Sequence, residues 1–577
     1  MVSAPPCGLG LYGRARSVRF PDHGRWRVLS RPDRASPAFP DPLLRFRSFW
    51  SWRVACVAGA ALSCAAPSRA LTQQVADSAP RIRRVVIVRH DVFDSVDAHS
   101  WYTRLTNQLH VRTQRMVVER ELLLHEGDRL DSARAAETGR NLRRLEVFRD
   151  VVVDTSASRD TLRVTTRDGW TTQPYATFRS TGTQKLFTIG LVETNFLGLA
   201  ATLDARYVQD PDRSLLRLAF GAPRILSNRI STGVFYNRLS DGSSAGFAIE
   251  QPYFSLSSRN AARASFVTFE GRVLRFRDGN LRPADSLDRR FTLGTVSVSH
   301  ALRASPRGYL RIGADVQFRR DDFVPRIGAP AVIPRSNTGA VTGYVDFSKA
   351  DYLVARNFRM LGQPEDVNLS HTVRLGVAVA PGALGYVRSA AGPVLYAQSG
   401  TRLPHGFATI VGRANALASG GAIDSGTATV AATVVYQPHR QHTFVAYSSM
   451  GWLHNTYPGG EFDLGLARGP RAYALHAFTG DRQRFSMLEY RWTALPNVAG
   501  SFAAGVAAFG ETGGAWFTGS PARYGTDAGL GVRFAPLRSP ANVGATRIDF
   551  VRRFKTDRDA AGWVLVVGTG FTFDNLR

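Results

Sequence analysis

Cysteine is scarce in this chain of 577 residues and is confined to its beginning. The only cysteines are Cys7, Cys56 and Cys64. Everything downstream of them therefore lacks the means to form a disulfide framework, a cysteine-ligated zinc site or a cysteine nucleophile. The chemistry of the main part of the protein has to come from other side chains.

Lysine is also scarce, although the chain carries a large positive net charge. The formal net charge of +27 first points to a nucleic acid or another anionic partner. Only Lys185, Lys349 and Lys555 are lysines, so nearly all of the 73 basic residues are arginines spread along the chain. Because the sequence has no Lys/Arg block of the kind that grips phosphate, we expect no nucleic-acid partner.

A long apolar run is also missing. The best candidate, Val54–Ala66, is shorter than the ~20 residues that a membrane-spanning helix needs. Arginines precede it and small residues follow it, which is the pattern of a secretory signal peptide. We therefore predict a leader over residues 1–70, with a signal peptide at about 45–70, and a linker over residues 71–80. A true start near residue 45 fits the same pattern.

Residues 81–170 switch between strand and helix patterns. A short apolar strand at Val85–Val88 precedes two amphipathic segments, Gln114–Leu124 and a second one capped by Asp131 or Ser132. Two further strand patterns follow. The order β-α-α-β-β predicts a small α+β domain of ordinary size.

The rest of the chain alternates polar and apolar residues in short segments, such as Leu310–Phe318 and Val373–Val379. A soluble β-sandwich alternates as well, so the pattern alone leaves both folds open. Export, missing cysteines and aromatic residues near strand ends favour a closed membrane barrel, in which every backbone amide is paired. For residues 175–577 we predict a mainly β fold, a transmembrane antiparallel β-barrel of about sixteen strands.

Five short segments resemble those of one known group of proteins. They are Glu121–Asp128, Asn141–Val151, Gly190–Gly198, Arg471–Tyr473 and Phe509–Gly513. The first two resemble a polypeptide-transport-associated (POTRA) domain, and the others resemble the barrel of the outer-membrane-protein assembly factor and bacterial surface antigen superfamily. The resemblance implies a barrel in a Gram-negative type of outer membrane, preceded by one POTRA-like domain in the periplasm.

The resemblance also implies a functional loop inside the barrel. In the superfamily, a lumenal loop carries an arginine and an aromatic residue, and the arginine meets an acid on the barrel wall. By position these are Arg471, Tyr473 and Glu511, with the lumenal loop at residues 469–480. Ala472 stands where the family has glycine, which would strain a backbone of positive φ. On spacing alone, a solvated loop arginine explains Arg471 as well.

A weak seam between the first and last barrel strands is a further implication of the resemblance. These strands lie near Tyr175–Ser180 and Trp563–Phe573. Glycine weakens strand pairing, so glycines at this position would loosen the seam. The residues that we assign to the seam are Tyr175, Phe178, Trp563, Gly568, Gly570 and Phe573.

Together these features predict a protein that inserts or translocates other proteins at the outer membrane. Its expected partners are membrane lipids and unfolded β-barrel or secreted clients, which would add a strand to the domain edge at Arg149–Thr155. That edge could equally pack on the barrel mouth. A passive pore or a lipid-transfer barrel with a single periplasmic domain is the alternative function.

Enzymatic interpretations find little support in the residues. Gly242–Gly246 matches a nucleophile elbow, but the strand pattern after it indicates a hairpin. His439 and His442 are spaced as in a turn, where exposed side chains are commoner than a metal site. We expect no enzyme activity, cofactor or metal.

The stretch His90–Val111 is longer than expected between the first strand and first helix of a POTRA domain.

Overall fold

The computed structural model describes residues 80–93, 101–155, 160–180, 184–225, 229–277, 279–280, 282–326, 335–359, 361–466, 468–540 and 545–569. The described residues from 82 to 569 belong to one compact unit. The predicted leader, its signal peptide and residues 71–79 of the predicted linker lie outside the described residues.

A small α+β domain opens the described chain. Its elements are β1 (Arg84–His90), α3 (Trp101–Leu109), α4 (Arg115–Glu121), α5 (Ser132–Arg144), β2 (Phe148–Asp154) and β3 (Thr161–Asp168). The three strands form a sheet in the order β1-β3-β2, with β1 parallel and β2 antiparallel to β3. This domain has one helix more than predicted, because α3 lies within the unexplained stretch His90–Val111. No helix in the described part of the chain is long and apolar enough to cross a membrane.

The helix α5 covers one face of that sheet. Asp131 precedes it and accepts hydrogen bonds from the backbone N–H groups of Ala133 (2.8 Å) and Arg134 (3.3 Å). Such a cap satisfies amides that the first helical turn leaves without partners. Leu142 of α5 is then buried in one apolar cluster with Leu162 of β3, so the N-terminal domain has a core of its own.

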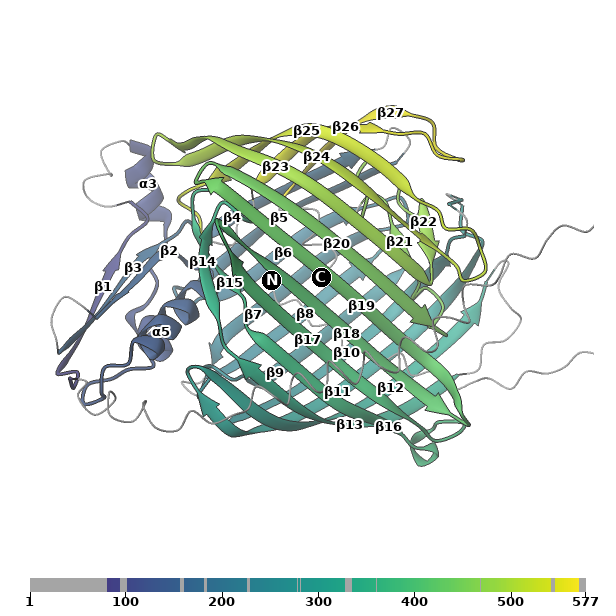
Figure 1. The fold of residues 1–577 in the computed structure, drawn as a ribbon, viewed down its shortest axis with the longest axis horizontal. Helices are drawn as coiled ribbons and strands as arrows, with labels where there is room; N and C mark the ends of the chain where they lie inside the picture. The colour runs from purple at the N-terminus through teal and green to yellow at the C-terminus, as the bar shows by residue number, and fades with distance from the viewer. Residues whose placement is uncertain are drawn as a thin grey trace, which may run out of the picture. The chain divides into compact units, whose positions relative to one another are not determined.

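Twenty strands close into one antiparallel barrel (Figure 1). They are β4 (Thr172–Ser180), β5 (Lys185–Phe196), β6 (Ala201–Gln209), β7 (Ser214–Ile225), β8 (Ile230–Leu239), β9 (Gly242–Gln251), β10 (Asn260–Arg275), β11 (Asp285–Ser305), β12 (Gly308–Pro325), β13 (Ser336–Lys349), β16 (His371–Ala380), β17 (Ala390–Leu403), β18 (Gly406–Ser419), β19 (Ala422–His439), β20 (His442–His454), β23 (Arg482–Val498), β24 (Phe502–Trp516), β25 (Gly525–Pro536), β26 (Thr546–Arg553) and β27 (Gly562–Thr569). We call the barrel end where β4 begins the near end and the opposite one the far end.

The predicted count of about sixteen strands is wrong. It assumed a strand and connection of roughly 25 residues, but many of the connections are much shorter. Only two residues separate β8 from β9, and the same holds for β17 and β18, β18 and β19, and β19 and β20. Gly242 is the first residue of β9, so the segment that matched a nucleophile elbow runs as a strand.

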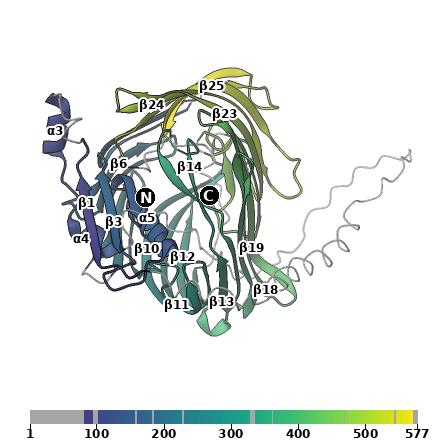
Figure 2. The ribbon, with the colours of Figure 1, turned by 60° about the vertical axis from the view of Figure 1, so that its left-hand side comes forward.

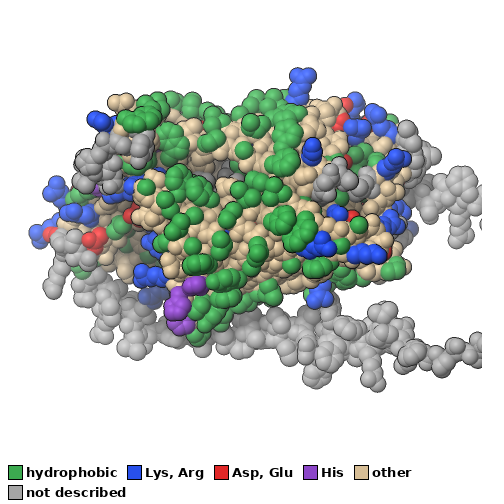
Figure 3. Space-filling model, turned by 90° about the horizontal axis from the view of Figure 1, so that it is seen from above, with side chains coloured by type: hydrophobic (Ala, Val, Ile, Leu, Met, Phe, Trp, Pro, Cys, Tyr) green, Lys and Arg blue, Asp and Glu red, His purple; other side chains and the backbone are tan. Residues whose placement is uncertain are grey.

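The barrel wall is apolar outside and polar inside. In β25, Leu530 is 68% exposed and Phe534 is 45% exposed, whereas Asp527 and Arg533 on the opposite face are buried. Figure 3 shows hydrophobic side chains across the middle of the wall, with lysine and arginine gathered toward its two ends. A soluble sandwich has the reverse arrangement, so this wall fits a lipid environment.

Two segments that are not part of the barrel wall enter the lumen. The first, which we call the lumenal hairpin, comprises β14 (Tyr352–Arg356) and β15 (Pro364–Asn368) between β13 and β16. The second is longer than the predicted residues 469–480: the lumenal loop, as we use the name from here on, spans residues 455–481 and contains β21 (Phe462–Leu464) and β22 (Phe478–Gly480). Figure 2 shows β14 within the ring of barrel strands. A short 3₁₀ helix, Gly382–Leu384, follows β16 at the far end.

Candidate functional site

The lumenal loop places Arg471 in a fully buried site. Gly469, with a φ of 95°, and Pro470 turn the chain inward. The backbone N–H of Arg471 donates to Glu511 Oε2 (3.1 Å), and its Nε donates to Glu511 Oε1 (3.1 Å). Its Nη1 donates to Asp549 Oδ2 at 2.6 Å. The loop arginine is therefore held by acids from two barrel strands, β24 and β26.

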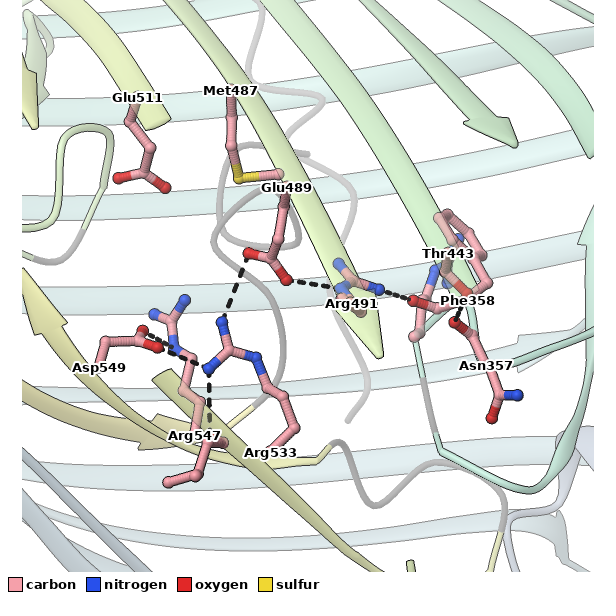
Figure 4. Close-up of polar contacts among 12 residues, drawn as sticks. Asn357, Phe358, Thr443, Met487, Glu489, Arg491, Glu511, Arg533, Arg547 and Asp549 are labelled. Atoms are coloured by element: carbon pink, nitrogen blue, oxygen red, sulfur yellow. Dashed lines mark hydrogen bonds and ion pairs between the residues drawn. The ribbon is translucent and has the colours of Figure 1, made fainter. Parts of the chain in front are cut away.

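Arg471 belongs to a larger cluster of buried charges. Glu489 of β23 lies 3.6 Å from Arg471 and 3.5 Å from Arg533 of β25. Arg533 also donates to Asp549 at 2.6 Å, and Arg491 of β23 donates to Glu489 at 2.5 Å (Figure 4). The members of this charge cluster are Arg471, Glu489, Arg491, Glu511, Asp527, Arg533, Arg547 and Asp549, four arginines and four carboxyl groups, all buried.

Pairing within the charge cluster offsets a large desolvation cost. A buried charge that loses its partner costs roughly 3–5 kcal/mol. Burial lowers the pKa of Arg471, but the carboxylates of Glu511 and Asp549 outweigh it and raise that pKa well above its ordinary value. The guanidinium also lies over the Phe509 ring, 3.7 Å from its centre. Arg471 therefore stays charged and fixes the loop to the wall.

The residues that follow Arg471 add contacts to the same wall. Ala472 donates its backbone N–H to Asp527 Oδ2 at 2.9 Å. It is not among the described residues of positive φ, so the strain expected from the missing glycine does not arise. The Tyr473 hydroxyl donates to the Phe554 carbonyl (2.8 Å) and accepts from the Thr526 N–H (2.9 Å). Burial raises the pKa of Tyr473 to about 12.

Sequence reasoning missed His476, which ties the lumenal loop to a distant turn. Its Nδ1 lies 2.6 Å from Asp463 of β21, and its Nε2 lies 2.9 Å from Asp212 in the turn between β6 and β7. Phe276 stacks on the ring, with 3.5 Å between centres. Burial lowers the pKa of His476, but the two carboxylates outweigh it and raise the pKa to about 9.

The lumenal hairpin was also missed, although a long gap between strand patterns after Lys349 could have signalled it. Its tip is fixed to the wall: the Thr443 hydroxyl donates to the Asn357 carbonyl at 3.3 Å, and Arg491 of the charge cluster donates to the Phe358 carbonyl (Figure 4). The Phe358 ring meets Phe407 of β18 edge to face at 5.1 Å. The hairpin and the lumenal loop contribute to one apolar cluster together with residues of the barrel wall.

The N-terminal domain contacts the near end of the barrel. Arg143 of α5 forms an ion pair with Asp366 of β15 at 2.7 Å. Asn195, at the end of β5, donates its side-chain amide to the Thr113 hydroxyl at 3.0 Å. Gly198 has a φ of 72°, and a Cβ there would lie 2.6 Å from the Arg112 carbonyl oxygen. Only glycine fits this junction.

The barrel closes through the pairing of β4 with β27. Within the described part of these strands, the pairs are Val566 with Arg179 and Val567 with Phe178. By contrast, β26 pairs with β27 along all eight of its residues. Arg179 Nη1 also donates to the Leu466 carbonyl of the lumenal loop at 3.2 Å.

The predicted seam residues differ in their surroundings. Phe178 lies in the ladder. Tyr175 and Trp563 lie on the two seam strands but contact other neighbours: Arg206 covers the Tyr175 ring at 4.6 Å, and Trp563 stacks on Phe550 at 4.4 Å. Gly568 lies beside Arg547: a Cβ on it would be 3.4 Å from Arg547 Nε. Gly570 and Phe573 lie outside the described residues.

The comparisons with known proteins found solved structures of low sequence identity. The sequence matches no protein-family model and no curated protein. BamA from Haemophilus ducreyi lacking POTRA domains 1–3 is 11% identical, with a TM-score of 0.35 over 86% of each chain. CdiB from Acinetobacter baumannii is 11% identical, with a TM-score of 0.40 over 85% of this chain and 74% of that one. CdiB from Escherichia coli is 11% identical, with a TM-score of 0.41 over 85% and 76%. Likenesses this distant establish no activity for this chain.

Proposed function

We propose that this protein is an outer-membrane barrel that inserts or translocates protein clients without covalent chemistry. The observation that carries the proposal is that the described residues of β4 and β27 pair at two positions. Fewer ladder pairs mean fewer backbone hydrogen bonds, so we expect the wall to open here at a lower cost than between β26 and β27. An open seam would expose two strand edges, to which an extended client can add a strand.

The lumenal loop is proposed to act as a latch on this seam. Arg471 holds the loop to strands β24 and β26, and the loop accepts a hydrogen bond from Arg179 on seam strand β4. A loop that is tied to both sides of the seam would keep it closed. Release of the charge cluster would then free the seam strand.

A passive pore is less well supported. The lumenal hairpin and the lumenal loop both contribute buried side chains to one apolar cluster with residues of the barrel wall, so we expect them to narrow any aqueous passage. Conductance in a planar bilayer tests this point. We expect low conductance from the whole protein and a several-fold rise after deletion of Gly469–Gly480.

The N-terminal domain is proposed to be a POTRA-like domain in the periplasm that receives clients. Its strand β2 is an edge of the sheet and starts beside the near end of the barrel. A cavity of about 320 Å³ lies there, lined by residues that include Arg149, Asp150, Gln363 and Leu537. An extended segment bound along β2 would therefore lie next to the turn that follows β25.

Reconstitution tests the proposed function directly. Vesicles that contain the purified protein should accelerate insertion of an unfolded β-barrel client over vesicles without it. Depletion in the native host should lower the amounts of outer-membrane proteins before the lipids change. High conductance with no effect on client insertion would instead identify a pore, and a change in lipids alone would identify a lipid-transfer barrel.

A further inference from the structure

The extra helix α3 carries an apolar stripe on its surface. Trp101, Leu105 and Leu109 are spaced four residues apart, which places them along one helical face. Their exposed fractions are 73%, 43% and 65%. Large apolar side chains gathered on one exposed face mark an interaction site more often than a solvated surface.

The opposite face of α3 is attached to its own domain. Thr103 is buried, and the side-chain amide of Asn107 exchanges two hydrogen bonds with the backbone of Phe93, at 3.1 and 2.8 Å. Just after the helix, His110 Nε2 lies 3.0 Å from Asp168 Oδ2. These contacts fix the rotation of α3 about its axis, so its apolar stripe is held outward.

The attachment point of α3 lies at the near rim of the barrel. The guanidinium of Arg538, just after β25, covers the Phe93 ring at 4.7 Å, and Arg538 Nε donates to the Gly500 carbonyl at 2.7 Å. On the outer wall, Phe502 of β24 and Phe534 of β25 stack at 4.8 Å and are both exposed. The apolar outer wall therefore ends beside Phe93 and Arg538, the contact that attaches the α3 region to the barrel.

The charged side chains of α3 and of the segment that follows it are basic. Arg104 lies within α3 and Arg112 follows it, both exposed, and no Asp or Glu occurs from residue 101 to residue 118. Arginine beside exposed tryptophan and leucine is the composition of helices that lie in a membrane interface. Basic side chains there are attracted to anionic lipid headgroups.

We propose that α3 docks on the phospholipid headgroup surface at the near end of the barrel and buries Trp101, Leu105 and Leu109 at the boundary with the acyl chains. This inference rests on the proposed membrane barrel. A protein occupant is disfavoured because three side chains on a short helix are far fewer than the roughly 20–30 residues of a stable protein interface. The Trp170 N–H donates to the Arg538 carbonyl at 2.7 Å, so docking would also steady the start of seam strand β4.

Site-specific fluorescence tests the docking. The full chain, with its three cysteines replaced by serine, receives a single cysteine as Leu105→Cys, labelled with an environment-sensitive dye. It is reconstituted into vesicles of phosphatidylethanolamine and phosphatidylglycerol. We expect several-fold stronger quenching by spin-labelled lipid than by aqueous iodide. A label at His125→Cys, on an exposed turn of the same domain, should show the reverse.

Two further variants separate the possible outcomes. A label at Leu530→Cys, on the outer wall, should be quenched by lipid whether or not α3 docks. If the labels at positions 105 and 530 were both exposed to water, the membrane barrel itself would be overturned. Two outcomes would overturn the docking alone, each with the label at 530 quenched by lipid. In the first, the label at 105 is quenched like the label at 125. In the second, neither quencher reaches the label at 105. Adding Trp101→Ser and Leu109→Ser should reduce lipid quenching at position 105 several-fold.

Discussion

Arg143 on α5 forms a two-pronged ion pair with Asp366 on β15, with nitrogen–oxygen distances of 2.7 and 2.8 Å. The pair joins the N-terminal domain to the lumenal hairpin. The hairpin tip in turn accepts a hydrogen bond from Arg491, and Arg491 meets Glu489, which lies 3.6 Å from Arg471. Polar contacts thus continue from the domain to the latch of the lumenal loop.

This link predicts a coupling between Arg143 and Asp366 that exposed ion pairs lack. Both side chains are 19% exposed, so we expect Arg143→Ala and Asp366→Ala to show a coupling energy of about 1–3 kcal/mol. Denaturant unfolding of the single and double variants in detergent measures it. The exposed pair Arg115 and Glu119 on α4 is the matched control, with an expected coupling of about 0.5 kcal/mol or less. Equal couplings for the two pairs would contradict the link.

The latch predicts that Arg471→Ala and Glu511→Ala are not additive. Each variant leaves buried charges without a partner, so we expect each to destabilise the barrel by about 3–5 kcal/mol. The double variant should be no worse than Arg471→Ala alone, because both changes break the same contacts. Arg484→Ala, at an exposed position of β23, is the control. Additive or negligible effects in unfolding experiments would make this an ordinary loop.

The seam predicts that a covalent bond between β4 and β27 blocks function. Cysteines at Phe178 and Val567, which are ladder partners, would cross-link the seam in a chain otherwise free of cysteine after residue 64. Client insertion should then stop and should return after reduction. A disulfide between Ile548 and Val567, across β26 and β27, should leave insertion intact. Undiminished insertion by the oxidised seam variant would exclude this opening.

The contacts of His476 predict that the lumenal loop is less stable at alkaline pH. Its folded-state pKa of about 9 exceeds the ordinary value of 6.5, so its pairs with Asp212 and Asp463 contribute fully below about pH 6.5. That contribution disappears as the pH rises through about 9. The melting temperature of the wild type should therefore exceed that of His476→Phe at pH 6.5, and the difference should shrink at pH 10. A difference that stays constant with pH, or the same trend in His439→Phe, would contradict this assignment.

Local alternation predicted strands. The segments Leu310–Phe318 and Val373–Val379 were predicted from it, and they lie in β12 and β16. The order of the motifs pointed to Arg471 and Glu511 as partners, and these side chains do lie together, while the latch itself stays a prediction. The strand count was too low because it allotted roughly 25 residues to each strand and connection, whereas two-residue turns such as that between β8 and β9 fit more strands into the same length.

The sequence by itself determined the two faces of the wall and the position of the loop that interrupts it, because both follow from neighbouring residues. Only the tertiary structure decided which inward charges meet. Glu489, Arg533 and Asp549 sit on different strands, and a single charged residue in an alternating strand carries no sign of its neighbours across the sheet. Closure and register bring them to Arg471, and burial there makes pairing obligatory.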